Sequence, residues 1–455
     1  MARDANDTTP ISSRGELVAW LEAGVKTKSG DLRIGTEHEK IPFYTATHAP
    51  VAYEGGIRAL IEGLQSAQGW TPIFDREAPI GLYDEASGGA ISLEPGGQFE
   101  LSGAPLADIH ATKMECDEHF RALEAIAAPL GIAFLDLGAS PKWSRSQTPV
   151  MPKQRYGIMS AYMPKVGALG LDMMFRTATI QVNLDFTSEA DMVRKLRIGL
   201  ALQPIVTALF ANSPFLDGKP TGALSQRSRI WLDTDPNRTG MLPFAFEEGM
   251  GFERYVDYAL DVPMYFVKRG EIYHDVAGAS FRDLLDGRLR QLPGERATIS
   301  DWANHLSTIF PEVRLKTYLE MRGADAGPRA HITALPALFA GLFYDSEALD
   351  GAYELTKDWS AEDRQTLRVE APVKALKARI QGRSANDVAV DMLALARAGL
   401  ERRSRLDALG SSEAIFLKPL EEIALTGEPL ASRRLKSFHE NWADSVEPAF
   451  EECVM

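Results

Sequence analysis

The sequence predicts an α+β protein in which helices cover one face of an antiparallel sheet and the other face forms a ligand funnel. The strand-like segments alternate polar and apolar residues, as strands do when one face is packed and the other is open. Strands and helices also lack the strict βαβ rhythm of a parallel sheet. Residues 345–441 are mostly helical in pattern, broken by Pro372 and by glycine-containing turns.

The individual elements follow from hydrophobic spacing and from turn residues. Between residues 106 and 130, for example, Ile109, Leu123 and Ile126 recur near helical spacing, and Gly131 follows as a stop signal. In chain order we expect a helix at 14–26, a strand at 32–44, helices at 54–68 and 106–130, a strand at 173–186, a helix at 189–212 and a strand at 313–323.

Composition limits the partners and the compartment. The net charge of −14 argues against nucleic acid or an anionic membrane as a partner. Two distant cysteines, Cys116 and Cys453, cannot form a disulfide framework, which fits a reducing compartment. No apolar run has the length of a signal peptide or a membrane span. We therefore expect a cytoplasmic protein, monomeric or homodimeric, that binds small molecules.

The first strand with candidate functional residues is Ile34–Lys40. Side chains two apart share one face of a strand, so Glu37 and Glu39 point the same way, with the small Gly35 beside them. Adjacent like charges repel, and a divalent cation between them would remove that cost. The alternative is a pair of solvated carboxylates at an exposed edge.

A hairpin is expected around residues 93–101. Its Pro-Gly-Gly turn lets Glu94 and Glu100 approach each other, while Phe99 and Leu101 face the core. The alternative is an ordinary hairpin without a ligand.

Two further strands have one polar face. In 175–186, the carbonyl oxygens of Gln181 and Asn183 could bind a hard cation or a substrate amide; the alternative is a threonine-rich solvent face. In 314–325, Glu320 and Arg322 share a face, which suits a metal–phosphate site. The alternative there is a surface ion-pair ladder.

Taken together, these strands offer oxygen ligands and no Cys/His cluster. Such ligands select Mg²⁺ or Mn²⁺ rather than Zn²⁺. The candidate carboxylates are Glu37, Glu39, Glu94, Glu100 and Glu320.

Arginines outside these strands could hold the carboxylates of amino-acid substrates through paired hydrogen bonds. The candidates are Arg155, Arg227 and Arg229, although surface arginines are the alternative. The sequence has no phosphate-binding GxxxxGK[ST] loop.

At this point the residues match a known family. Long segments closely resemble the glutamate–cysteine ligases of the plant and proteobacterial type, and the resemblance runs from about residue 14 to the C-terminus. The matching segments are Gly35–Lys40, Leu93–Pro105, Met151–Gly157, Met173–Phe186, Ala201–Pro214, Ser225–Tyr265, Asp301–Val313 and Tyr318–Asp325.

The resemblance implies one catalytic domain over residues 1–455, with a flexible N-terminus at 1–13 and a mostly helical C-terminal part at 345–455. It implies a glutamine-synthetase-like fold, in which the antiparallel sheet forms half a barrel. It also implies the first step of glutathione synthesis: ATP phosphorylates the γ-carboxylate of glutamate, and the cysteine amine attacks the acyl phosphate. Mg²⁺ or Mn²⁺ would be the cofactor.

The resemblance also implies roles for single residues. Arg322 would contact phosphate and act catalytically with Glu320. Substrate-binding residues would be Arg155, Arg227, Arg229, Thr179 and Tyr265, the last near the cysteine pocket. Metal ligands would be Glu37, Glu39, Glu94, Glu100, Gln181 and Glu320.

Two other functions stay open from sequence. One is a related carboxylate–amine ligase with a different acceptor amine. The other is a non-catalytic amino-acid or nucleotide sensor that kept the fold, although a sensor could lose the metal ligands that this chain retains.

The chain should be insensitive to reversible oxidation. Plant members of the family carry regulatory disulfides, and the matching positions here hold no cysteine: they are Lys113, Val276, Gln291 and Thr333. We expect kcat to be equal after incubation with oxidised or reduced dithiothreitol, and a reversible loss of about tenfold would contradict this. Slow irreversible loss would be oxidative damage instead.

Overall fold

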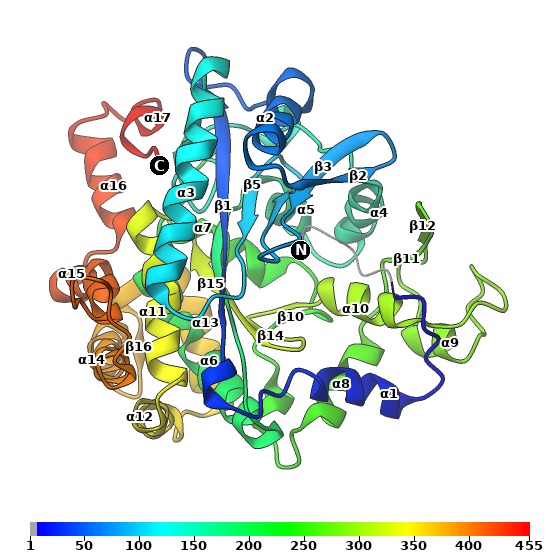
Figure 1. The fold of residues 1–455 in the computed structure, drawn as a ribbon. Coiled ribbons are helices and arrows are strands. Elements are labelled where there is room, and N and C mark those ends of the chain that lie inside the picture. The colour runs from blue at the N-terminus through cyan, green and yellow to red at the C-terminus, as the bar shows by residue number, and fades with distance from the viewer. Residues whose placement is uncertain (1–6) are drawn as a thin grey trace.

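A nine-stranded antiparallel sheet forms the centre of the computed structural model, which describes residues 7–455 and confirms the predicted α+β class (Figure 1). Eight strands run in the order β14-β15-β7-β1-β5-β4-β3-β2, and β6 pairs with the far half of β1. The sheet is open at both ends of this order and forms no closed barrel. Its strands are β1 (Ile34–Tyr44), β2 (Thr71–Asp75), β3 (Ala78–Tyr83), β4 (Ala90–Leu93), β5 (Phe99–Ser102), β6 (Ile132–Leu135), β7 (Thr179–Leu184), β14 (Val313–Leu315) and β15 (Leu319–Asp325).

Short two-stranded pairings decorate the periphery, and one of them, between β10 and β13, is parallel. These strands are β8 (Phe215–Leu216), β9 (Lys219–Pro220), β10 (Thr239–Gly240), β11 (Phe266–Arg269), β12 (Ile272–Asp275), β13 (Phe310–Pro311), β16 (Arg379–Ile380) and β17 (Arg383–Ser384).

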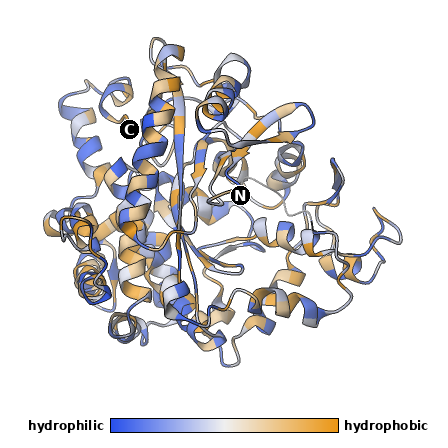
Figure 2. Ribbon diagram, viewed as in Figure 1, coloured by the Kyte–Doolittle hydropathy of each residue, from blue (hydrophilic) through white to orange (hydrophobic). Residues whose placement is uncertain are grey.

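Helices α3, α6 and α11 pack against the sheet, and α3 and α11 both run beside β1 (Figure 1). Figure 2 shows α11 as a largely hydrophobic helix, as expected for a helix buried on most sides. The helices are α1 (Arg14–Glu22), α2 (Arg58–Gln68), α3 (Ile109–Ala127), α4 (Gln154–Tyr162), α5 (Gly170–Arg176), α6 (Glu189–Leu209), α7 (Gln226–Ile230), α8 (Phe252–Asp261), α9 (Phe281–Leu285), α10 (Ile299–Ser307), α11 (Arg329–Phe343), α12 (Ser346–Thr356), α13 (Ala361–Lys374), α14 (Ala385–Arg403), α15 (Lys418–Thr426), α16 (Leu430–Glu440) and α17 (Ala449–Glu452).

Strand β1 directs polar side chains to both faces of the sheet. Its even-numbered residues face the helices: the His38 ring stacks on Phe120 of α3 at 5.4 Å, and the Lys40 ammonium lies 3.0 Å from His38 Nδ1. Its odd-numbered residues Glu37 and Glu39 therefore point to the opposite face. The alternation predicted from sequence thus decides which side of the sheet becomes the site.

Two predicted strands have different bounds in the structure. The segment expected as one strand at 173–186 begins with the end of α5, whose last turn is held by Arg176, bonded to Asp172 (3.0 Å) and Asp217 (2.8 Å). A cation in the last turn of a helix is also stabilised by the helix dipole. The strand expected at 313–323 is instead the hairpin β14–β15. The alternation of polar and apolar residues does not show where a turn interrupts a strand when that turn is stabilised by tertiary contacts.

The flexibility predicted for residues 1–13 stays a prediction, but part of this segment packs against the rest of the chain. Residues 1–6 lie outside the described part, but residues 7–13 dock beside α10. Ile11 is 1% exposed and donates its N–H to Ala297 (2.8 Å), and Ile299 donates to Thr9 (3.0 Å). The buried Ile11 side chain and these backbone hydrogen bonds hold the segment, and they involve residues far away in the chain that a local pattern does not identify.

The predicted helical C-terminal part is confirmed, with a short β16–β17 hairpin between α13 and α14. The organisation as one domain stays a prediction. Within the described residues, no helix is long and apolar enough to cross a membrane.

Helix α3 carries a buried carboxyl group outside the polar face. Glu115 Oε1 accepts the N–H of Ala104 (2.8 Å), and Oε2 is buried without a hydrogen-bond partner among the described residues. Burial raises the pKa of Glu115 to about 7. Because the pKa of Glu115 is higher in the folded protein than in the unfolded chain, its contribution to the stability of the folded state is fully present below pH 4.5. That contribution is lost as pH rises through 7.

Replacing Glu115 by Gln should therefore change the pH dependence of stability. We expect the free energy of unfolding of the wild type, relative to Glu115→Gln, to fall between pH 4.5 and pH 8 by at most about 3 kcal/mol. Urea denaturation across this range measures it. Parallel pH profiles for the two proteins would contradict the assignment.

Candidate active site

A pocket opens on the polar face of the sheet, between β1, β5, β7 and β15 on one side and helices α4, α5 and α7 on the other. It gathers most of the residues that sequence singled out from distant segments. The predicted residues that line it are Glu37, Glu39, Glu94, Glu100, Arg155, Thr179, Gln181, Arg227 and Arg322.

The acidic side of the pocket is built by strand register. Antiparallel pairing places Glu39 opposite Glu100 on β5, and Glu37 opposite Gln181 on β7. Directly opposite residues in an antiparallel pair share a face at short separation. Glu94 joins them from the turn between β4 and β5, as the predicted hairpin requires.

Neutral donors hold these carboxylates in the described part of the chain. Asn183 Nδ2 donates to Glu37 (2.7 Å), the Thr179 N–H donates to Glu39 (3.1 Å), and Ser102 Oγ donates to Glu100 (2.9 Å). Neutral donors do not cancel the charge, so the carboxylates still repel one another.

The electrostatic consequence is a raised pKa at three of the four carboxylates; at Glu100, although burial raises the pKa, hydrogen bonds from Ser92 and Ser102 contribute to lowering it. Burial, followed by the charges of Glu94 and Glu100, raises the pKa of Glu39 well above its usual value. Burial and neighbouring carboxylates also raise the pKa values of Glu37 and Glu94. The acidic side therefore favours a proton or a metal cation.

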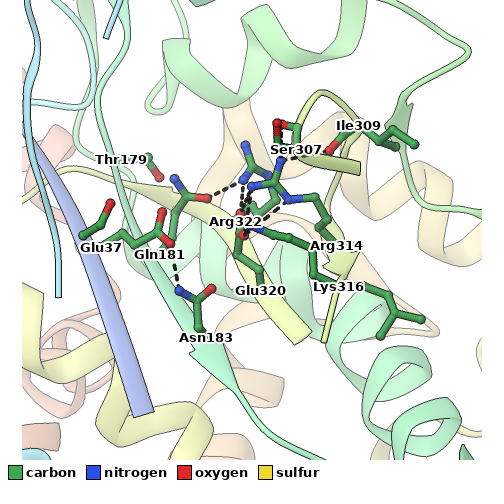
Figure 3. A network of polar contacts seen from close by, with 12 residues as sticks. Glu37, Thr179, Gln181, Asn183, Ser307, Ile309, Arg314, Lys316, Glu320 and Arg322 are labelled. Atoms are coloured by element: carbon green, nitrogen blue, oxygen red, sulfur yellow. Dashed lines mark hydrogen bonds and ion pairs between the residues drawn. The ribbon is translucent and has the colours of Figure 1, made fainter. Parts of the chain in front are cut away.

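The opposite side of the pocket is basic (Figure 3). Arg322 donates from Nη1 to Gln181 Oε1 (2.6 Å) and also pairs with Glu320. Arg314 pairs with Glu320 at 2.7 Å and donates to the backbone oxygens of Ser307 (2.8 Å) and Ile309 (3.1 Å). These contacts fix both guanidinium groups before any substrate binds.

Glu320, whose role as a metal ligand stays a prediction, has cationic side chains as its partners in the structure. It is fully buried and does not line the pocket; it pairs with Arg314, Lys316 (3.0 Å) and Arg322. Although burial raises it, these three cations hold the pKa of Glu320 well below its usual range. In this structure Glu320 is the counter-ion of the basic side, because the hairpin β14–β15 puts Arg314 directly across from it.

A β-bulge shapes β15 next to the pocket. Met321 pairs with Val182 but Ala324 pairs with Ile180, so β15 has one extra residue at Arg322–Gly323. Bulges re-aim side chains and are frequent next to active sites. On the other side of β15, the Arg322 N–H donates to the Glu312 carbonyl (3.2 Å), which continues the pairing of β14 with β15.

Arg227 and Arg155 reach the pocket from helices. Arg227, on α7, is 3% exposed and donates to the carbonyl of Arg322 (2.9 Å). Arg155, on α4, lies 5.6 Å from the centre of the Tyr156 ring.

Two predicted substrate residues lie elsewhere. Arg229 is exposed and bonds the carbonyl of Thr221 (3.2 Å), because residues two apart on a helix point in different directions. Tyr265 is buried under the Arg238 guanidinium at 3.9 Å and does not line the pocket. Thr179 lines the pocket, but its hydroxyl donates to the carbonyl of Ala324 (2.7 Å).

The structure adds lining residues that sequence reasoning missed. Arg314 belongs to a segment already considered, and its alternation with Leu315 was the signal that could have found it. Others come from the ends of short elements, where periodicity gives no signal: Trp231 directly follows α7, Ser307 ends α10, Thr308 follows it and Phe310 begins β13.

A second hollow reaches the same acidic side from another direction. Glu37 lines both hollows, so the second one continues the first along the polar face. Its other polar lining residues are Arg33, Tyr83, Ser102, Asn183, Asp185 and Tyr318.

The donor chemistry fits a hard divalent cation. All the pocket's anionic side chains are carboxylates, and buried carboxylates with raised pKa values gain most from a cation. Among the described residues, no three acidic, histidine or cysteine side chains are already grouped as a metal-binding set.

Comparison with known proteins shows which proteins the chain resembles along its length. The chain is 53% identical to the chloroplastic glutamate–cysteine ligase of Nicotiana tabacum over 442 residues, which is 97% of this chain and 83% of the relative. It is also 53% identical to the chloroplastic enzyme of Arabidopsis thaliana over 447 residues, covering 98% and 84%.

These relatives correct the predicted location. Their names place them in the chloroplast, which contradicts the prediction of a cytoplasmic protein. A low cysteine count distinguishes reducing from oxidising compartments, but it does not separate one reducing compartment from another.

A solved structure supports the fold. The glutamate–cysteine ligase of Francisella tularensis, in complex with AMP, matches with a TM-score of 0.54 at 11% identity, over 94% of this chain and 89% of that one. The family model for glutamate-cysteine ligase family 2 matches residues 33–452. This chain belongs to glutamate–cysteine ligase family 2.

Proposed function

We propose that this ligase joins the γ-carboxylate of L-glutamate to the amine of L-cysteine, with ATP as co-substrate, in the first step of glutathione synthesis. One observation carries the proposal: a single pocket in which buried carboxylates on strands face guanidinium groups. A cation–nucleotide complex and an amino-acid carboxylate need these two charge types side by side. The relatives named above are glutamate–cysteine ligases, and they align with nearly the whole of this chain.

The reaction needs activation of a poor electrophile. Transfer of the γ-phosphoryl group of ATP to the glutamate carboxylate gives an acyl phosphate and ADP. Attack by the cysteine amine then forms the amide and releases phosphate, and the amine loses a proton. Phosphoryl transfer depends mainly on alignment and charge stabilisation.

The basic side supplies that stabilisation. Arg322 is held by Glu320 and Gln181, so its guanidinium is oriented before the transferred group develops charge. Arg227 and Arg155 line the same pocket, and both would bind substrate carboxylates through planar, paired hydrogen bonds. No protein nucleophile is required.

Mg²⁺, or Mn²⁺, is the proposed cofactor, and Glu37, Glu39, Glu94 and Glu100 would hold it. When bound, the ion neutralises phosphate charge. Gln181 stays a candidate ligand next to them, although its side-chain oxygen accepts from Arg322 in this structure.

The two hollows fit two kinds of substrate. Glu37 lies at their junction, so a nucleotide in one hollow and an amino acid in the other would meet at the acidic side. We propose that the guanidinium-lined hollow takes the amino acid and the hollow around Tyr83 and Tyr318 takes the nucleotide.

Arg227 should control substrate affinity. With glutamate, cysteine, Mg²⁺ and ATP, we expect Arg227→Ala to raise KM for one amino-acid substrate at least about tenfold through loss of a bidentate contact. Arg227→Lys should recover only part of this, because an ammonium cannot reproduce the planar fork. ADP release measures both.

Arg229→Ala is the matched control, since this exposed arginine on the same helix should leave KM unchanged. Equal KM values for Arg227→Ala and wild type would remove Arg227 from the site. A panel of acceptor amines tests the reaction itself: turnover with another amine and none with cysteine would give a different ligase, and no ADP release would favour a sensor.

Metal binding should depend on Glu39 and on pH. We expect millimolar Mg²⁺ to raise the melting temperature of the wild type by mass action, and Glu39→Gln to reduce that rise. Burial and neighbouring carboxylates raise the pKa of Glu39, so the ion must compete with a proton. The rise should therefore be larger at pH 8.5 than at pH 6.

Glu77→Gln serves as the control, because this glutamate is exposed outside the pocket. An identical Mg²⁺ response in Glu39→Gln and Glu77→Gln would refute the proposed ligand set.

A further inference from the structure

Asp325, at the end of β15, is a buried carboxylate behind the pocket wall. It is 1% exposed and does not line the pocket. Its Oδ2 accepts the N–H of Asn212 (2.9 Å) and the hydroxyl of Ser213 (2.7 Å), and its Oδ1 accepts the hydroxyl of Ser225 (2.8 Å). Three donors thus converge on one carboxylate, which fixes it in place.

Both serine hydroxyls connect Asp325 to helix α7. A hydroxyl has one proton, so a serine that donates to Asp325 presents its lone pairs elsewhere. Ser213 Oγ accepts the N–H of Arg227 (3.0 Å), and Ser225 Oγ accepts the N–H of Ser228 (3.1 Å) as the N-cap of the helix. The carboxylate therefore orients both acceptors that begin α7.

Helix α7 needs this support because it is only five residues long. Isolated helices of this length are unstable in water, so tertiary contacts must hold them. Arg227 is its second residue, and the Arg227 guanidinium reaches the pocket from there. Any movement of the start of α7 would move that guanidinium.

The hydrogen-bond network around Asp325 extends through Asn212 to helix α16. Asn212 donates from Nδ2 to the carbonyl oxygens of Asp136 (2.7 Å) and Ala326 (2.9 Å), and its Oδ1 accepts from Arg434 of α16 (2.6 Å). Arg434 also pairs with Asp136 (2.8 Å). The loop that carries Ser213 is thereby fixed from both sides.

We propose that Asp325 is a positioning residue for substrate binding, which acts through the hydroxyls of Ser213 and Ser225 to set the position of α7 and hence of the Arg227 guanidinium. Asp325 itself does not touch the substrate. The kinetic part of the test rests on the proposed function; the spectroscopic part does not.

The kinetic test compares Asp325→Asn, Ser225→Ala and Ser225→Thr. We expect the first two to raise KM about tenfold for the amino acid that Arg227 binds, with kcat and the KM for ATP changed less than about twofold. Ser225→Thr keeps the hydroxyl and should restore KM. Asp325→Asn should add little in an Arg227→Ala background, because coupled residues are non-additive.

The spectroscopic test uses the ligand-free protein. The Nε–H resonance of Arg227, assigned by its loss in Arg227→Ala, should shift or broaden in Asp325→Asn and Ser225→Ala. Ser384→Ala, which removes the N-cap of α14, is the matched control and should leave this resonance and the kinetics unchanged.

The outcomes separate the two proposals. An unmoved Arg227 resonance in Ser225→Ala and Asp325→Asn would overturn the positioning role, whatever the enzyme's substrates are. Equal loss of affinity for every substrate, or full additivity with Arg227→Ala, would also overturn it. A shifted resonance with no wild-type turnover of glutamate and cysteine would retain the positioning role and reject the proposed reaction.

Discussion

Antiparallel pairing around β1 brings buried like charges together, and the other parts of the site are arranged around that constraint. Glu39 faces Glu100 across one strand pair, and Glu37 lies on the same face. Burying charges without partners is costly, so the pKa values of Glu37 and Glu39 are raised, whereas the pKa of Glu100, which accepts hydrogen bonds from Ser92 and Ser102, is lowered. A bound cation would relieve this repulsion, so the electrostatic cost of the folded site would contribute to affinity for the proposed Mg²⁺ or Mn²⁺.

The basic side solves the opposite problem. Arg314, Lys316 and Arg322 would repel one another in a buried wall, and Glu320 sits among them. With three cations and one anion, this cluster keeps a net positive charge toward the pocket. Removing one partner of a buried ion cluster leaves uncompensated charge, which is strongly destabilising. Glu320 therefore stabilises the basic side by partly neutralising these three cations.

Rigidity around the pocket comes from the scaffold behind it. The bulge in β15 aims Arg322, and the Asp325 anchor fixes the start of α7. Loops and short helices place the remaining lining residues, and buried hydrogen-bond networks compensate for their low intrinsic stability. The hydrophobic helix α11 and helix α3 pack behind β1, so the strand that carries Glu37 and Glu39 has little freedom to move.

The sequence by itself determined the α+β class, the polar face of each main strand and the hairpin that carries Glu94 and Glu100, because these depend on periods of two residues and on local turn chemistry. Similarity of long segments also led to the correct family. Tertiary structure alone decided that Glu320 pairs with cations, that Arg229 and Tyr265 lie away from the pocket, and that residues 7–13 are anchored. Those outcomes depend on contacts between segments far apart in the chain, which no local pattern encodes.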